Sequence, residues 1–501
     1  MEAHQSIASA ELNPPAVLMG FYFFPRGGSA QVTRYLCRAL GRGEVALTLF
    51  AGSVGQADET SNAERFFRGV DCSTLDYSPA RRAWAEGNDP MQAEVPMHAS
   101  YEAKPSVPDR TFFELDDSAF ARQVGSWRTF LCGTADRVTP DPSVVHLHHL
   151  TPMHEAVRSL WPHAPIITHL HGPELKMLAA VHDPVAAAAA GPWVSRWVDR
   201  MRRWAGDSAR VVVVSSQDEK LVQVLLPVDA TKVVTIANGV DTEVFSAHRR
   251  SAPERMAKWK RWLIDDPRGW RPGQAEGSVV YTQADLEVLV DEAGAAVPVV
   301  LFAGRFLRFK RVQLLIEAHH AMQKTLGHSS VLVIAGGFPG EWEGEHPFDT
   351  VERLGTRDVF LAGWRDHDEL ADMLSCSDVF AAPSVDEPFG LVYLEAMAAG
   401  LAPIATNTGG PATFINIDAG RPTGWLVPPD DVDATTAALT QAVCDPAVRI
   451  ERGARAARFV RQRYSWALSA AAFKDLYAAV VAEHSNRCNP APGDSARLRE
   501  F

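Results

Sequence analysis

The sequence predicts an α/β protein built from two doubly wound domains. Short apolar runs rich in Val and Ile alternate with segments of helical periodicity through most of the chain. These runs lack the polar–apolar alternation of half-exposed strands, so they suit parallel strands covered on both faces. The alternation falls into two series, and a length of 501 residues suits two to four domains. We therefore expect two open parallel sheets in tandem.

The first series opens with a strand–helix–strand unit. The run AVLMGF predicts a strand at residues 16–21, a loop follows at 25–29, then a helix at 30–40 and a strand at 45–51. The later elements of this series are predicted as strands at 143–148, 165–170, 210–215 and 232–237, with helices at 153–161, 193–205 and 216–226.

The second series repeats the pattern. Its predicted strands are residues 298–303, 330–335, 358–361, 379–383, 402–406 and 425–427. The helices predicted between them are residues 311–326, 366–375, 391–399 and 432–443.

Two segments fit neither series. Residues 70–115 are rich in charge, Pro and Met, and we expect a long loop or insertion there. Residues 249–296 join the two series and contain Trp259, Trp262 and Trp270, which we expect to pack between the domains.

Composition disfavours several classes of protein. The net charge of −12 argues against nucleic acid as a partner, because phosphate binding needs a basic surface. The six cysteines lie far apart without a CxxC pair, which is typical of a reduced cytoplasmic protein. The first residues show neither a basic n-region nor an apolar h-region, and no window reaches about 18 apolar residues. We therefore expect a cytoplasmic protein without a signal peptide or a transmembrane helix.

The most informative stretch is DEPFGLVYLE at residues 386–395. Glu387 should end the loop after the strand at 379–383, and Pro388 and Gly390 should open a helix that carries Glu395. Free backbone N–H groups at such a helix start suit a diphosphate, and the two carboxylates suit the hydroxyls of a sugar and a ribose. The alternative is a pair of surface acids at a helix start, where acids are common.

This stretch resembles the E-x7-E signature of the large retaining glycosyltransferase family usually numbered four, which has the GT-B architecture. Glu387 and Glu395 match the two glutamates, and Phe389, Gly390 and Leu391 match the segment between them. The sequences AMAAG and TGGP that follow also match that family. The resemblance implies two Rossmann-like domains that face a cleft, with the acceptor bound by the first and the donor by the second.

The same resemblance sets the expected domain bounds. They are an acceptor domain at 1–245 with an insertion at 70–115, an interdomain insertion at 246–296, a donor domain at 297–462, and a C-terminal helix with a tail at 463–501. The helix, at about 465–485, is expected to return to the first domain.

A basic loop, GRFLRFK, follows the strand at 298–303. Its Arg offers a bidentate fork and its Lys a point charge, and both suit phosphates. By resemblance, Arg305 and Lys310 match the G-R-x4-K pair that grips the donor diphosphate in this family. The alternative is a solvated basic loop.

Two further candidates lie at strand ends of the first series. By resemblance, His171 matches a His-Gly pair that contacts the donor sugar or the acceptor, and His169 is expected to point elsewhere. A structural histidine is the alternative. Gly27 and Gly28 are expected to bring backbone N–H groups to the donor phosphates or the acceptor, unless they only form a tight turn. The turn NGVD, from Asn238, resembles the family's end of the first domain and is expected to be structural.

No metal and no cofactor is expected. His146, His148, His149 and His154 suggest a metal site, but on a strand His146 and His148 share one face while His149 faces away. No Cys or carboxylate is placed to complete a ligand set. Two fixed cations and the helix start at Gly390 can instead neutralise a diphosphate.

The segment WVSRWVDRMRRW at 193–204 carries an aromatic face and a basic face. Trp197 and Trp204 lie on the first, and Arg200 and Arg203 lie elsewhere. A core helix with a solvated basic face is the favoured interpretation. Peripheral contact with an anionic membrane is the alternative.

The expected function is that of a hexosyltransferase-like enzyme. It would move a sugar from a UDP- or GDP-sugar, with retained configuration, to an acceptor such as a small soluble metabolite. Alternatives are a glycan- or lipid-linked acceptor at a membrane surface, a non-catalytic nucleotide-sugar-binding protein, and a GT-B epimerase. Residues 335–337 and Trp364 are expected to border the base.

Overall fold

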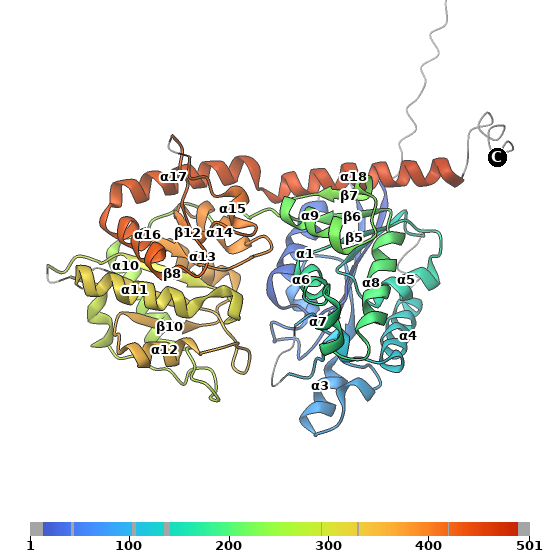
Figure 1. Ribbon diagram of the computed structural model, residues 1–501, viewed down its shortest axis with the longest axis horizontal. Coiled ribbons are helices and arrows are strands. Elements are labelled where there is room, and N and C mark those ends of the chain that lie inside the picture. The colour runs from blue at the N-terminus through green and yellow to red at the C-terminus, as the bar shows by residue number, and fades with distance from the viewer. Residues whose placement is uncertain are drawn as a thin grey trace, which may run out of the picture.

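Two parallel sheets, each flanked by helices, form two lobes side by side (Figure 1). The computed structural model describes residues 14–41, 45–102, 107–134, 141–291, 293–327, 330–418 and 420–488. The first sheet has the order β3-β2-β1-β4-β5-β6-β7, and the second has the order β10-β9-β8-β11-β12-β13. The two doubly wound domains predicted from the sequence are therefore confirmed.

The first lobe contains seven strands and nine α-helices among its described residues. The strands are β1 (Ala16–Phe21), β2 (Ala46–Ser53), β3 (Cys72–Asp76), β4 (Val144–His148), β5 (Ile166–His169), β6 (Arg210–Val213) and β7 (Val233–Thr235). The α-helices are α1 (Gly27–Leu40), α2 (Ala63–Phe66), α3 (Ser78–Ala85), α4 (Asp117–Gly133), α5 (Met153–Leu160), α6 (Pro173–Ala180), α7 (Pro184–Ala189), α8 (Val194–Asp207) and α9 (Ser216–Leu225).

The second lobe follows the same plan. Its strands are β8 (Val299–Ala303), β9 (Val331–Ala335), β10 (Val359–Gly363), β11 (Val379–Ala381), β12 (Pro403–Thr406) and β13 (Trp425–Val427). The α-helices from α10 onward are α10 (Ala252–Lys260), α11 (Val312–Leu326), α12 (Pro347–Leu354), α13 (His367–Ser375), α14 (Leu391–Ala398), α15 (Pro411–Phe414), α16 (Val432–Cys444), α17 (Pro446–Arg463) and α18 (Trp466–Cys488). The shorter helical turns are η1 (Pro90–Gln92), η2 (Phe112–Glu114), η4 (Ala230–Lys232), η5 (Arg261–Asp265), η6 (Asp285–Leu289) and η7 (Arg308–Lys310).

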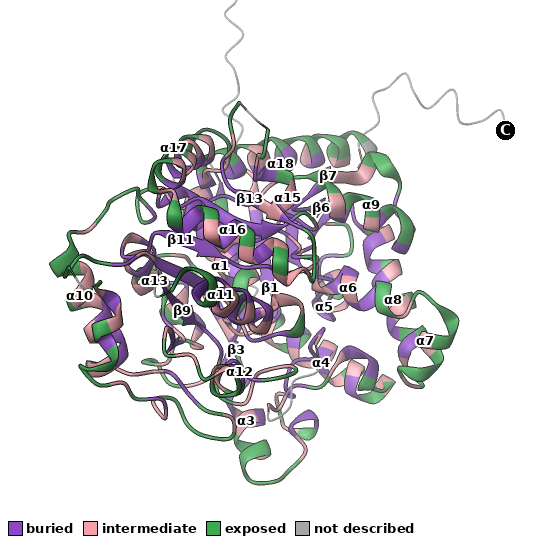
Figure 2. Cartoon of the chain, turned by 60° about the vertical axis from the view of Figure 1, so that its left-hand side comes forward, coloured by how far each residue is buried: buried purple, intermediate pink, exposed green. Residues whose placement is uncertain are grey.

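Strand burial explains why the apolar runs predicted these sheets. Every residue of β8, β9 and β10 is buried, so their Val, Ile and Leu side chains leave water completely. Burial of each such side chain stabilises the fold by about 1.5–3 kcal/mol. Figure 2 shows the buried residues along the strands and the exposed ones on the outer helix faces.

The strand order fixes where a ligand can bind. In each sheet the direction of winding reverses between two neighbouring strands, β1 and β4 in the first sheet and β8 and β11 in the second. Ligands of open α/β sheets bind beyond the strand C-termini at such reversals. Gly27 and Gly28 follow β1, Arg305 follows β8, and Glu387 follows β11.

The expectation of a loop at residues 70–115 is wrong. β3 pairs with β2 in parallel and extends the sheet, and α3 follows it. Only Ser73 and Leu75 of β3 are buried, in alternation, because β3 is an edge strand. A short alternating strand lacks the continuous apolar run by which the other strands were recognised.

The expectation that the three tryptophans pack between the domains is also wrong. Trp259, Trp262 and Trp270 are each 1% exposed and belong to the core of the second lobe. Trp270 stacks on Phe306 with ring centroids 5.9 Å apart. The large apolar side chains predicted that these residues are buried, but the sequence did not show which sheet they cover.

The chain crosses back to the first lobe through α18, which lies along that lobe in Figure 1. Tyr477 of α18 bonds through its hydroxyl to Nδ1 of His146 on β4, at 2.7 Å. The NGVD turn supports this crossing, since Val240 bridges to Ser465 and a Cβ at Gly239 would collide with the backbone of Trp466. The predicted tail beyond Cys488 lies outside the described residues.

The aromatic face of α8 points into the core. Trp197 and Met201 are fully buried, and Trp197 Nε1 donates to the carbonyl oxygen of Leu115 at 2.8 Å. Arg200 lies over the ring of Phe120 at 3.9 Å. Among the helices described, none is long and apolar enough to cross a membrane.

Candidate active site

A cleft of about 630 Å³ lies between the two lobes and is lined by residues of both. All the site residues predicted from the sequence lie on its walls. They are Gly27, Gly28, His171, Arg305, Lys310, Glu387, Phe389, Gly390, Leu391 and Glu395.

The cationic side of the cleft is built by the loop after β8. Arg305 Nη1 forms an ion pair with Oε2 of Glu102, a residue of the first lobe, at 2.8 Å. Lys310 Nζ forms an ion pair with Glu387. Both cations are therefore already held beside oxyanions, which is the environment that a phosphate would supply.

The start of α14 forms another part of the wall. Gly390 is its N-cap residue with a φ of +89°, a conformation that favours glycine. No side chain caps this helix, so its first N–H groups remain available to a ligand. Glu387 is 9% exposed and Glu395 is 4% exposed.

Glu395 is held by a neighbour that the sequence did not single out. His367 Nε2 lies 3.0 Å from Glu395 Oε1, and His367 Nδ1 lies 3.0 Å from the hydroxyl of Tyr35. His367 stands at the first position of α13, and Tyr35 lies on α1 of the other lobe.

His171 sits at the edge of a layer of imidazoles. Its Nε2 lies 2.9 Å from Nδ1 of His148, and its backbone N–H donates to Oε1 of Glu174 at 2.9 Å. The other oxygen of Glu174 lies 3.2 Å from Nδ1 of His149. Burial, together with the neighbouring imidazoles, holds the pKa of His171 well below its usual range, so this ring is neutral near pH 7.

His169, which was expected to point elsewhere than His171, lies directly behind it and does not line the cleft. The rings of His169 and His171 stack with centroids 4.4 Å apart. Residues two apart along an extended chain share a face, so the two rings lie side by side, but His169 is fully buried and, of the two, only His171 lines the cleft.

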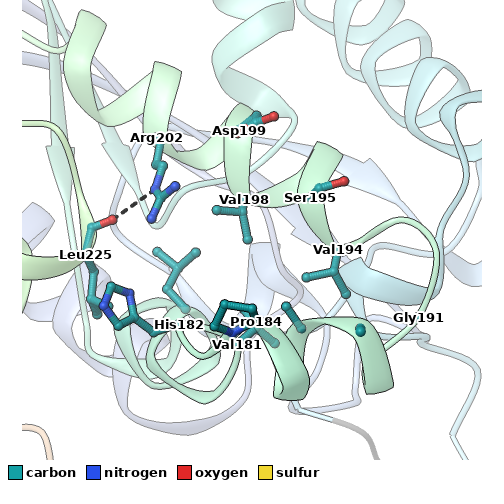
Figure 3. A pocket seen from close by; sticks show the side chains of 13 residues that line it. Val181, His182, Pro184, Gly191, Val194, Ser195, Val198, Asp199, Arg202 and Leu225 are labelled. Carbon is teal, nitrogen blue, oxygen red and sulfur yellow. Dashed lines mark hydrogen bonds between the residues drawn. The ribbon is translucent and has the colours of Figure 1, made fainter.

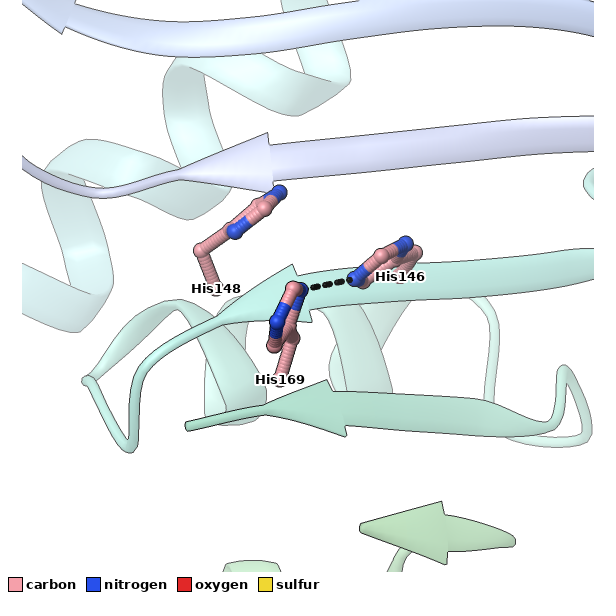
Figure 4. A group of neighbouring side chains, drawn as sticks. All are labelled: His146, His148 and His169. Carbon is pink, nitrogen blue, oxygen red and sulfur yellow. Dashed lines mark hydrogen bonds between the residues drawn. The ribbon is translucent and has the colours of Figure 1, made fainter. Parts of the chain in front are cut away.

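Figure 4 shows the closest approach to a metal-ligand set among the described residues. One nitrogen from each of His146, His148 and His169 lies within 4.8 Å of the others. Both nitrogens of His146 are engaged, Nδ1 by Tyr477 and Nε2 by Nδ1 of His169 at 3.3 Å. Burial lowers the pKa of His146 to about 3. Burial also lowers the pKa of His148 and His169, so these rings form a neutral layer beside His171.

The Asp-x-Asp spacing, which holds divalent ions in some glycosyltransferases of a different architecture, occurs twice, at residues 366–368 and 431–433. Asp366 accepts the backbone N–H of Glu369 at 2.8 Å, and Asp431 accepts that of Ala434 at 2.8 Å. Both aspartates are therefore helix N-caps. Asp366 and Asp368 also line the cleft.

A second cavity, of about 390 Å³, lies beside α8 (Figure 3). Val194 and Val198 face it, and Arg202 Nε donates to the carbonyl oxygen of Leu225 at 3.2 Å. None of the site residues predicted from the sequence lines this cavity.

Several residues of the cleft carried no signal in the sequence. Lys176 lies in the cleft with Nζ 3.8 Å from the ring of Phe309, which links the two lobes. Glu102 falls in the segment that was expected to be an insertion. Tyr35 and His367 lie on predicted helices. Polar residues are common on helices, and the sequence does not show that these two face each other across the cleft.

Two family profiles match the chain. Residues 293–462 match the family described as glycosyl transferases group 1, and residues 98–244 match Glycosyltransferase Family 4. D-inositol 3-phosphate glycosyltransferase of Kineococcus radiotolerans is 31% identical over 287 residues, which are 55% of this chain and 58% of that protein. Alpha-maltose-1-phosphate synthase of Mycolicibacterium smegmatis is 28% identical over 302 residues, 58% of this chain and 68% of that protein.

Solved structures agree in fold. Sucrose-phosphate synthase from Thermosynechococcus elongatus superposes with a TM-score of 0.64 at 19% identity, over 94% of this chain and 100% of that one. Anabaena Alr3699/HepE in complex with UDP-glucose superposes with a TM-score of 0.58 at 15% identity, over 94% of this chain and 100% of that one. These likenesses establish the GT-B architecture that the resemblance implied.

Proposed function

Since the chain belongs to the glycosyltransferases of the GT-B architecture, we propose that it transfers a sugar from a UDP- or GDP-sugar to an acceptor hydroxyl with retained anomeric configuration. The observation that carries this proposal is the meeting of Arg305, Lys310, Glu387 and Glu395 in one cleft. Two cations and two carboxylates suit the two halves of a sugar nucleotide, its diphosphate and its hydroxyls.

Arg305 and Lys310 bind the donor diphosphate and stabilise the charge that develops on it as the glycosidic bond breaks. Fixed cations aimed at developing charge are the main electrostatic device of such reactions. The N–H groups at the start of α14, and those at Gly27 and Gly28, add oriented dipoles. Because α1 has no side-chain cap and no acid in its first turn, its N-terminus is also open to an anion.

Glu387 orients the donor sugar, Glu395 binds the ribose, and His171 contacts the reacting sugar. The pKa of His171 is lowered mainly by burial, and this suits a position beside the reacting sugar. A neutral imidazole can exchange hydrogen bonds with a sugar without repelling the positive character that the sugar gains in the transition state.

The acceptor is proposed to be a small soluble metabolite, and the enzyme to act in the cytoplasm. The names of the two relatives refer to inositol phosphate and to maltose phosphate, which supports a small carbohydrate acceptor. The cleft of about 630 Å³ is of the size that ligand sites of proteins have.

A panel of UDP- and GDP-sugars, screened by thermal unfolding and then by nucleotide release, tests the proposal. A true donor at 100 times its dissociation constant should stabilise the protein by about 2.7 kcal/mol. NMR of the product then reads its anomeric configuration. Binding without nucleotide release for any acceptor would instead identify a non-catalytic nucleotide-sugar-binding protein, and inversion of configuration would remove the retaining assignment.

A further inference from the structure

A chain of polar contacts, two hydrogen bonds and one histidine–carboxylate contact, runs from the first lobe across the cleft to Glu395. Arg34 Nη2 lies 3.2 Å from the hydroxyl oxygen of Tyr35, that oxygen lies 3.0 Å from Nδ1 of His367, and His367 Nε2 lies 3.0 Å from Oε1 of Glu395. Four side chains from two lobes are therefore joined end to end.

The donor at the Arg34 end orients the Tyr35 hydroxyl. A guanidinium only donates, so the Tyr35 oxygen accepts from Arg34 and its own proton points to Nδ1 of His367. When the Tyr35 hydroxyl donates to Nδ1, a ring proton of His367 is left on Nε2, which faces Oε1 of Glu395.

Packing holds both middle members in place. The ring of Tyr35 stacks on Trp466 of α18, with centroids 5.7 Å apart and planes 11° apart, and Tyr35 is 7% exposed. The ring of His367 meets the edge of Phe245 at 5.1 Å. The positions of both rings are therefore set by their lobes, and the hydrogen bond between them depends on how the two lobes are placed.

We infer that His367 is a positioning residue for Glu395 and that Tyr35 makes this positioning depend on the first lobe. This inference rests on the proposed function, in which Glu395 binds the ribose. His367 engages Oε1, which sets the plane of the carboxylate and leaves Oε2 to face a ribose hydroxyl. A carboxylate already held in one orientation loses less conformational freedom when the donor binds. The first lobe thereby contributes to ribose binding through a residue that does not itself touch the ribose.

The test crosses two variants with two ligands that differ only in the ribose. Tyr35→Phe keeps the stack on Trp466 and removes the proton given to His367, and His367→Ala removes the link to Glu395. Calorimetry measures the affinity of each protein for UDP and for 2′,3′-dideoxy-UDP, with GDP and its dideoxy counterpart run in parallel. A net hydrogen bond corresponds to about a two- to twelvefold change in affinity.

The expected result is selective. Tyr35→Phe and His367→Ala should each weaken binding of the hydroxylated nucleotide by about two- to twelvefold. Binding of the dideoxy nucleotide should weaken by less than about twofold. His367→Gln, which keeps an N–H donor toward Glu395, should restore much of the lost affinity. Tyr477→Phe is the matched control: it also removes a buried Tyr–His hydrogen bond, of 2.7 Å, but should leave the ratio of the two affinities unchanged.

Two other outcomes are distinguishable. If Tyr35→Phe and His367→Ala weaken binding of both nucleotides equally, or leave both affinities unchanged, the positioning role of His367 is wrong. Ribose recognition by Glu395 then still stands. If the wild-type protein binds neither nucleotide, or binds the hydroxylated and dideoxy forms equally, then the proposed role of Glu395 is itself wrong, and the inference falls with it.

Discussion

Arg305 of the second lobe donates to Glu102 of the first across the cleft, with 2.8 Å between Nη1 and Oε2. Arginine binds carboxylates and phosphates through the same fork of N–H groups. The guanidinium is therefore placed for an oxyanion, and in this structure the oxyanion comes from the protein. A donor diphosphate that binds Arg305 must displace Glu102 or share the guanidinium with it.

The first prediction follows from that competition. Glu102→Gln should strengthen UDP or GDP binding by about two- to tenfold, because the ligand no longer replaces a charged partner of Arg305. Calorimetric titration measures the change. Glu59→Gln is the control, since Glu59 pairs with Arg81 away from the cleft. Equal or weaker binding by Glu102→Gln would show that the ion pair does not oppose the ligand.

Replacing Glu395 with Ala should mainly weaken donor binding, because a ribose hydroxyl loses its acceptor. A hydrogen bond to a charged group contributes about 1.5–3 kcal/mol, which corresponds to about a 10- to 150-fold loss of affinity. Titration with the identified nucleotide checks the change. Unchanged affinity would remove Glu395 from the donor site.

Replacing Glu387 with Ala should lower turnover more than donor affinity, if its contact strengthens as the sugar gains positive character. The variant also frees Lys310 from its ion pair, which should help to retain diphosphate binding. Steady-state kinetics separates the two parameters. Normal turnover with a raised Michaelis constant would contradict the role assigned to Glu387.

The sequence predicted the strands and the site motifs that depend on local sequence pattern. The runs at 16–21 and 425–427 coincide with β1 and β13, because strands whose residues are mostly buried carry an unbroken apolar run. The acidic and basic motifs lie where strands end, so the residues of the cleft were recognised before their geometry was known. β3 was missed because an edge strand buries only alternate residues, here Ser73 and Leu75. Contacts between lobes, such as Tyr35 with His367, depend on the docking of elements far apart in sequence.

Trp197→Glu should destabilise the fold by more than about 3 kcal/mol, because a carboxylate would replace a fully buried indole whose N–H is satisfied by Leu115. Thermal unfolding and vesicle co-sedimentation, measured together, check this. Ser195→Glu, on an exposed position of α8, serves as the control and should unfold like the wild type. A stable Trp197→Glu protein that no longer sediments with anionic vesicles would favour the membrane alternative.

We propose that Arg305 and Lys310 hold the donor diphosphate without a metal ion. Calorimetry of UDP against UMP, and of GDP against GMP, in excess EDTA tests it most directly. The wild type should bind one diphosphate about 10- to 150-fold more tightly than its monophosphate, and Arg305→Ala or Lys310→Ala should remove most of that difference. Arg308→Ala, whose side chain is outside the cleft, should retain the difference. If EDTA abolishes the preference for the diphosphate and Mg²⁺ or Mn²⁺ restores it, the account of the leaving group is wrong.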